Sequence, residues 1–247
     1  MHSTLRTADP SRAGRLPLRD ERQTATTWEA AIVLGIPVIV FLEYHLRAIW
    51  AQEAHGQPVA EVMYSDVRLL RTLGWEVVMA GALLWWLSRR GWRPARVLGM
   101  PNLRDVLRGA VLWCATFAVV RCTNLLLAAV APGLYNTTHD APLQGALSWP
   151  VYLAALAINP IFEEMLWLGY AVPALGRAAG IRVAALVSVG LRVAVHVPQG
   201  GWALVSVLPL AAVWTGYFLW QRRLWPVVVA HVINNAFGLG EFVEAPI

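Results

Sequence analysis

Residues 148–175 have the sequence SWPVYLAALAINPIFEEMLWLGYAVPAL. The stretch is long enough to cross the hydrocarbon core of a bilayer, which needs about 20 helical residues. Two adjacent carboxylates, Glu163 and Glu164, lie near its middle. Because a charge at the bilayer centre costs at least about 2.5–3.5 kcal/mol, such residues are expected to have a function or a specific partner. The segment therefore predicts a transmembrane helix that supplies polar groups to a buried site.

The composition of the whole chain favours a membrane protein. Of its 247 residues, 57% are hydrophobic and 14% are charged, whereas soluble domains have roughly 45–50% apolar and about 25% charged residues. These values exclude a disordered chain and argue against a soluble globular one. The net charge is +5 and all 20 basic residues are arginine. Arginine-rich loops are typical of membrane proteins, so this charge does not indicate nucleic-acid binding.

Six further apolar segments accompany the first, which predicts an all-α, polytopic integral membrane protein with about seven transmembrane helices. The seven segments are 28–48, 69–88, 107–131, 148–175, 182–198, 202–221 and 224–240. The division of the chain assigns 1–27 to a disordered cytoplasmic tail, 28–147 to N-terminal helices and loops, 148–240 to a helical core, and 241–247 to a C-terminal tail. The buried site that Glu163 and Glu164 indicate is expected in this core, among the last four helices.

Arginines alternate between the predicted loops, which indicates the orientation of the chain. The tail, loop 88–106 and turns 176–182 and 221–224 are rich in arginine, whereas the loops between them hold one arginine or none. Cytoplasmic loops of membrane proteins carry an excess of basic residues. We therefore expect an inner or plasma membrane protein with its N-terminus inside and its C-terminus outside.

Two ionisable residues of the N-terminal segments, Glu76 and Arg121, have similar predicted depths below the outer surface. At about 1.5 Å per helical residue, these depths agree within roughly 5 Å. We therefore predict a salt bridge between them that links two helices and has a structural purpose.

The other ionisable groups of the predicted spans lie in the last 90 residues. Glu163 precedes Arg177 by 14 residues and His196 follows Arg182 by 14, so both lie about 21 Å from the same inner turn if their helices are regular. Arg192 shares a helix face with His196, and His231 shares one with Asn235, because each pair is four residues apart. The same reckoning places His231 some 9 Å shallower than Glu163.

These residue types suit the hydrolysis of an acyl bond. A carboxylate and an imidazole together activate a water molecule, and a second histidine with an asparagine can donate hydrogen bonds to the oxyanion that forms on the substrate. Three alternatives stay open: a structural cluster without activity, a proton relay in a transporter, and a zinc site. The chain has no internal repeat typical of a carrier and no His-Glu-x-x-His motif. A zinc site built from Glu163, His196 and His231 ranks below a metal-free site, because its ligands come singly from three helices.

The chain resembles the CPBP intramembrane proteases, which include the type two CAAX-prenyl endopeptidases and bacteriocin-processing or immunity proteins. Their pattern is Glu-Glu-x-x-x-Arg, then Phe-x-x-x-His, then His-x-x-x-Asn or a small residue. The corresponding stretches here are 163–168 EEMLWL, 192–196 RVAVH and 231–235 HVINN. The resemblance implies a glutamic protease without metal or cofactor, in which Glu163 and His196 activate water. It also implies that His231 and Asn235 stabilise the oxyanion and that Glu164 supports the site.

Two positions depart from this pattern. Leu168 stands where the family has arginine, and Arg192 stands where the family often has phenylalanine. We expect a compensation, in which Arg192 reaches Glu164 or Glu163 from the neighbouring helix. The predicted protein is an intramembrane endopeptidase that acts on a membrane-associated protein or peptide, for example on a C-terminal tail or sorting signal. The alternatives are a catalytically silent immunity or scaffold protein of the same family and a proton-coupled transporter.

Overall fold

The computed structural model describes residues 26–55, 64–90, 99–133, 135, 145–196, 203–240 and 243. These residues form seven helical rods, one for each predicted apolar segment, so the all-α prediction is confirmed. The rods are α1 (Thr27–His55), α3 (Asp66–Arg89), α5 (Leu103–Val130), α7 (Trp149–Glu164) with η2 (Met165–Ala171) and α8 (Val172–Ala179), α9 (Ile181–His196), η4 (Ala203–Val207) with α10 (Leu208–Gln221), and α11 (Trp225–Gly240). The predicted tails lie almost entirely outside the described residues.

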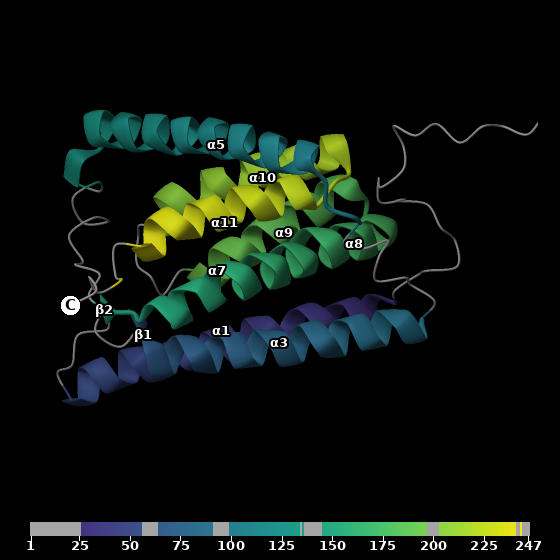
Figure 1. Ribbon diagram of the computed structural model, residues 1–247, viewed down its shortest axis with the longest axis horizontal. Coiled ribbons are helices and arrows are strands. Elements are labelled where there is room, and N and C mark those ends of the chain that lie inside the picture. The colour runs from purple at the N-terminus through teal and green to yellow at the C-terminus, as the bar shows by residue number, and fades with distance from the viewer. Residues whose placement is uncertain are drawn as a thin grey trace, which may run out of the picture.

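The rods run roughly side by side in a layered bundle (Figure 1). Helices α1 and α3 lie on one side, α5 lies on the opposite side, and the remaining helices fill the space between them. Helix α7 contacts α3 on one side and α11 on the other, and α11 packs along α5. The helix that carries Glu163 and Glu164 therefore runs through the interior of the bundle.

Element η2 is fully enclosed, since all seven of its residues are buried. One hydrophobic cluster joins it to α1 and α3 through Trp167, Leu34 and Leu83. A second cluster joins it to α5 and α10 through Leu168, Leu112 and Trp214. The same short segment thus closes the core towards both outer layers.

Element η2 is a π-helix set between two α-helical segments, which the sequence analysis did not predict. In a π-helix the hydrogen bonds run from i to i+5, and such stretches often occur at functional sites. The hydroxyl of Ser188 on α9 donates a hydrogen bond to the carbonyl of Trp167 at 2.8 Å. The π-helix begins directly after Glu164, and its backbone is tied to the neighbouring rod.

A single residue, Gly180, links α8 to α9. Its φ of 87° lies in the region that glycine adopts readily and other residues rarely do. The two rods therefore turn back on each other within one residue, and they run antiparallel from a shared end.

Helices α5 and α11 approach each other closely at Gly109. A Cβ atom at this position would lie 2.5 Å from Cβ of Val229 and 2.8 Å from the carbonyl oxygen of Pro226. Near the same end, Asn102 and Asp105 cap α5 with reciprocal side-chain to backbone hydrogen bonds. Asp105 also binds Arg223 through two contacts, at 2.7 Å and 2.5 Å. The start of α5 is therefore fixed to the turn before α11.

The opposite end of the bundle is closed by a short two-stranded parallel sheet. Strand β1 (Tyr64–Ser65) pairs with β2 (Gly145–Ala146). Beside the sheet, the backbone N–H of Ser148 donates to Oδ1 of Asp66 at 2.9 Å. These contacts connect the starts of α3 and α7, which pack against each other along the bundle.

Two of the described rods are long and apolar enough to cross a membrane, Leu103–Val130 and Trp149–Ala179. Helices α9, α10 and α11 have 16, 14 and 16 residues, which is fewer than the roughly 20 residues that a bilayer crossing needs. Helix α5 exposes large apolar side chains on its outer face, among them Val111, Phe117 and Leu125 at 70%, 53% and 65% exposure. The outer surface of α5 is thus suited to contact lipid.

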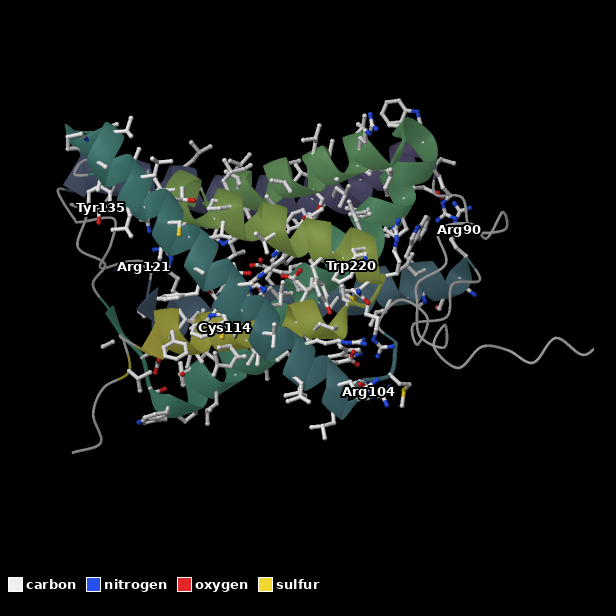
Figure 2. The ribbon with its side chains drawn as sticks, turned by 90° about the horizontal axis from the view of Figure 1, so that it is seen from above. Arg90, Arg104, Cys114, Arg121, Tyr135 and Trp220 are labelled. Carbon is white, nitrogen blue, oxygen red and sulfur yellow. The ribbon has the colours of Figure 1, made fainter. Side chains whose placement is uncertain are left out.

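The predicted salt bridge between Glu76 and Arg121 is wrong. Glu76 is fully buried on α3, and its carboxylate accepts a hydrogen bond from Asn159 on α7. Arg121 is exposed on α5 (Figure 2), the outer helix on the far side of the bundle. Helices α3 and α5 lie in different layers of the bundle, so the two side chains do not meet.

Candidate active site

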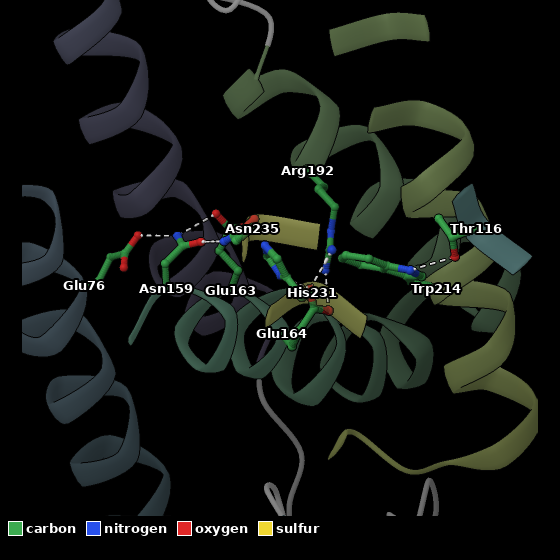
Figure 3. Close-up of polar contacts among 9 residues, drawn as sticks. All are labelled: Glu76, Thr116, Asn159, Glu163, Glu164, Arg192, Trp214, His231 and Asn235. Atoms are coloured by element: carbon green, nitrogen blue, oxygen red, sulfur yellow. Dashed lines mark hydrogen bonds and ion pairs between the residues drawn. The ribbon is translucent and has the colours of Figure 1, made fainter. Parts of the chain in front are cut away.

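The two adjacent carboxylates at the end of α7 point into different polar networks (Figure 3). Glu163 faces Asn159, Asn235 and Glu76, whereas Glu164 faces Arg192 and His231. Both are buried, with exposures of 6% and 0%. Since neighbouring helix positions are rotated by about 100° around the axis, one pair of carboxylates serves two separate groups of partners.

Glu164 is held by two neighbouring helices. The guanidinium of Arg192 on α9 donates to both of its carboxylate oxygens, at 2.7 Å and 2.6 Å. Nδ1 of His231 on α11 lies 2.8 Å from Oε1 of the same carboxylate. The expected contact between Arg192 and Glu164 is therefore present, and its bidentate geometry is the strong form of this interaction. The predicted difference in depth does not keep His231 away from the carboxylates.

Trp214 on α10 lies against this group. Its ring centre is 5.1 Å from the imidazole of His231 and 5.4 Å from Cζ of Arg192, a distance at which a cation and an aromatic ring attract each other. The indole N–H donates to Oγ1 of Thr116 at 3.0 Å, and that hydroxyl donates to the carbonyl of Leu112 at 2.8 Å. Through this hydrogen bond, helix α5 positions the Trp214 ring, which packs against the side chains of Arg192 and His231.

Glu163 belongs to a second network, centred on Asn159. The amide nitrogen of Asn159 donates to Oε1 of Glu76 at 2.8 Å and to Oε1 of Glu163 at 3.0 Å. The amide of Asn235 on α11 donates to Oδ1 of Asn159 at 2.9 Å. Oε2 of Glu163 is buried and has no hydrogen-bond partner among the described residues. One oxygen of Glu163 is therefore bound by Asn159, and the other, like Oε2 of Glu76, is a buried acceptor without a partner among the described residues.

The ring of His196, at the end of α9, is oriented by its own helix. Its Nδ1 lies 2.7 Å from the carbonyl of Arg192, and because a carbonyl only accepts hydrogen bonds, Nδ1 carries the proton. Nε2 of the neutral ring then keeps its lone pair. Among the described residues no hydrogen bond joins His196 to Glu163.

The register between the two rods places His196 near Glu163. Ser188 bonds to Trp167, and Arg192 bonds to Glu164. Between the first pair and the second, the position on α9 advances by four residues and the position on the rod of α7 and η2 goes back by three. Continuing this antiparallel register by one turn brings His196 opposite the turn of α7 that contains Asn159 and precedes Glu163. The side chain thus belongs to the same region of the bundle.

The predicted site residues Glu163, Glu164, Arg192, His231 and Asn235 are thus joined in two adjacent networks, with His196 beside them. Sequence analysis did not identify Asn159, Trp214 and Thr116, and it gave Glu76 the wrong partner. A signal existed for Asn159, which lies four residues before Glu163 and so shares its helix face. The site draws on α3 and α5 as well as on the last four rods. Within the residues described, no group of three or more His, Cys, Asp or Glu side chains is placed to bind a metal ion.

Comparison with known proteins identifies one region of the chain. Residues 145–237 match a family model described as Type II CAAX prenyl endopeptidase Rce1-like. The match spans β2 to most of α11, and it includes every predicted site residue. Neither the curated proteins nor the solved structures compared with the chain gave a significant match.

Proposed function

We propose that the protein is an intramembrane endopeptidase. The premise is that residues 145–237 form an Rce1-like type II CAAX prenyl endopeptidase domain. In this proposal, Glu163 and His196 activate a water molecule for attack on a peptide bond. The observation that carries the proposal is the state of Glu163. Its Oε1 is held by Asn159, while its buried Oε2 has no partner among the described residues. Glu76 has a buried, unpartnered Oε2 as well, but it lies outside the region that matches the family model.

The proposed reaction begins with proton transfer from water to Oε2 of Glu163. The lone pair on Nε2 of His196 accepts the second hydrogen of the water as a hydrogen bond and so orients the attack. The water oxygen bonds to the carbonyl carbon, and an oxyanion forms on the substrate. The carbon–nitrogen bond then breaks, and Glu163 returns its proton to the departing amine. The products are a carboxylic acid and an amine, and Glu163 is again ionised.

Asn235 and His231 are the proposed donors to the oxyanion. One N–H of the Asn235 amide binds Asn159, so its second N–H is available. Nδ1 of His231 faces the carboxylate of Glu164, which only accepts hydrogen bonds. Donation from Nε2 therefore requires the protonated imidazolium form of His231, whose charge Glu164 helps to balance.

Glu164 has a supporting part in this scheme. Arg192 occupies both of its oxygens, so the carboxylate is not available to accept a proton from water. We assign to this ion pair the part that the resemblance gives to an arginine at position 168, where this chain has the buried Leu168. The cation comes from α9 instead of from the helix of Glu164 itself.

A membrane location with the N-terminus inside is part of the proposal. Two rods are long and apolar enough to span a bilayer, and α5 exposes an apolar outer face. Arg90 and Arg104 lie at the same end of the bundle in Figure 2, whereas Tyr135 lies at the other. Further arginines occur at the α8–α9 and α10–α11 turns. A single arginine-rich end supports the predicted cytoplasmic side.

A comparison of protein termini in native membranes tests the proposed activity. Membranes that contain the wild-type chain are compared with membranes that contain Glu163→Gln at matched abundance. Glu29→Gln, at the start of α1, makes the same chemical change outside the site. Wild type and Glu29→Gln should both generate new N- and C-termini that Glu163→Gln does not, and those termini identify the substrate. We expect a membrane-associated protein cleaved near its C-terminus.

Identical termini in all three samples would contradict the proposal. That result would instead favour a catalytically silent immunity or scaffold protein of the same family, a second candidate suggested by Leu168 at the position of the arginine. In that case Glu163→Gln should keep the cellular phenotype of the wild-type chain. Thermal unfolding of the purified variants verifies that any loss of cleavage does not come from unfolding.

A further inference from the structure

Asn159 uses both of its side-chain N–H groups and its carbonyl oxygen on three polar partners from three helices. Its two N–H groups have acceptors in Glu76 on α3 and Glu163 on α7, and its oxygen accepts from Asn235 on α11. Figure 3 shows these side chains in a continuous row. Asn159 is therefore the point at which the proposed base and a proposed oxyanion donor are connected.

The direction of each bond in this row follows from the chemistry of the partners. The amide nitrogen of Asn159 lies against Oε1 of both Glu76 and Glu163, and because an amide nitrogen only donates, each of these oxygens accepts a hydrogen bond. Its oxygen then faces Asn235, whose nitrogen must be the donor. Two acceptors on one side thus determine which way both amides are turned. Without Glu76 on α3, only Glu163 would be left as an acceptor to orient the amide nitrogen of Asn159.

We infer that Asn159, oriented by Glu76, is a positioning residue that aims both Glu163 and Asn235 at the substrate in the proposed peptidase reaction. The inference rests on the proposed function. With Oε1 of Glu163 bound to Asn159, Oε2 is turned away from the amide. With one N–H of Asn235 bound to Asn159, its other N–H is directed to a different side. The row aligns the atom that accepts the proton with the atom that donates to the oxyanion.

A structural reading of the same contacts is that Asn159 only attaches α7 to α3. A buried amide–carboxylate bond does stabilise a helix pair, because breaking it leaves a buried group without its partner. Yet the attachment of α3 requires only the bond to Glu76. The bonds from Asn159 to Glu163 and from Asn235 join residues that already share a helix or adjacent packed helices. The two readings therefore differ in what happens when the Glu76 contact is kept and the Glu163 contact is removed.

A swap of the two side chains creates that situation. In Asn159→Asp three carboxylates face one another, so the variant should lose both stability and activity. In Asn159→Asp combined with Glu76→Gln, the amide of the new glutamine can donate to the new aspartate, which restores the link between α3 and α7. The aspartate can still accept from Asn235, but it has no N–H to donate to Glu163. The double variant has as many carboxylates as wild type, but a contact between the new aspartate and Glu163 replaces the bond that positions Glu163.

Peptide cleavage and thermal unfolding separate the two readings. The full-length variants are purified in detergent and assayed with a peptide that spans the cleavage site found by comparison of termini. We expect the double variant to regain most of the unfolding temperature that Asn159→Asp loses, with kcat at least ten-fold lower than wild type and KM within two-fold. Asn124→Ala on α5 is the matched control and should leave kcat and the unfolding temperature unchanged. Recovery of both stability and kcat would show a purely structural role and overturn the inference.

A second measurement does not depend on cleavage of any peptide. Selective ¹⁵N labelling of asparagine is practical because the chain contains only Asn102, Asn124, Asn136, Asn159, Asn234 and Asn235. Asn159→Ala should shift the side-chain amide resonances of Asn235 and speed their exchange with water, whereas Asn159→Asp, which keeps an acceptor, should change them less. Unchanged Asn235 resonances in Asn159→Ala would disprove the row of bonds, whether or not the wild-type protein is a peptidase.

Discussion

Replacement of Arg192 by methionine tests the ion pair at the centre of the bundle. Methionine fills a similar volume without a charge, so Glu164 keeps only His231 as a partner. Glu164 is fully buried and Arg192 is 2% exposed, and removal of one member of such a pair typically costs about 3–5 kcal/mol. The remaining 2.8 Å contact with His231 puts the expected loss near the lower end, at about 3 kcal/mol. That loss lowers the ratio of folded to unfolded protein about a hundred-fold.

The assay is denaturant-induced unfolding of the purified protein in detergent, followed by circular dichroism. Arg182→Met, on the exposed side of the same helix, is the control for the loss of an arginine and should change stability by less than about 0.5 kcal/mol. A loss of less than about 1 kcal/mol in Arg192→Met would refute the view that Glu164 depends on this cation.

A charge-relocation variant tests whether the position of the cation matters or only its presence. Leu168 is fully buried and follows Glu164 by four residues on the same rod. Leu168→Arg combined with Arg192→Phe returns the arginine to the place where the family pattern has it. The double variant should be more stable and more active than Arg192→Phe alone. If it is not, Arg192 does not replace the missing arginine.

Two further predictions concern the contact of α5 with the α11 side of the bundle. Gly109→Ala should destabilise the protein by about 1–3 kcal/mol in the same unfolding assay, because its new methyl group would overlap Val229. Gly216→Ala, with no atom within 4 Å of the added Cβ, is its control and should not destabilise. Asp105→Ala should cost about 3 kcal/mol, since it leaves Arg223 without its buried partner and uncaps α5. Equal stabilities of Asp105→Ala and wild type would show that this clamp contributes nothing.

The sequence was sufficient to predict the helical rods, because long apolar segments separated by arginine-rich or glycine-containing turns have few other interpretations. The predicted ends were less accurate. Helix α1 continues to His55 although the apolar segment stops near residue 48, since a polar segment can extend a helix beyond the part that determines it. The π-helical geometry of η2 has no distinctive local residue pattern, so it was not predicted.

The neighbour of a residue across the bundle was not predictable from the sequence. Glu76 and Arg121 were expected at similar depths, yet their helices lie in different layers and Glu76 meets Asn159 instead. The contact between Arg192 and Glu164 was predicted from a comparison with the family pattern. The pattern has an arginine where this chain has Leu168, and this chain gains a cation at Arg192, which suggested that the two positions lie on adjacent helices. Trp214 offered no such signal among 13 tryptophans, since only the packing of α10 shows that its ring supports the site.

The one-residue connection at Gly180 is the point about which α9 would tilt, and it lies at the end of the helix opposite to His196 of the proposed site. The helix has 16 residues, so His196 lies about 24 Å from Gly180, and a tilt of only about 5° would displace its imidazole by about 2 Å. A displacement of 1 Å can reduce an enzymatic rate about a hundred-fold. The hydrogen bonds of Ser188 and Arg192 to the opposite rod restrain this tilt at two points along α9. Mutations near the turn would therefore change the aim of His196 without touching it.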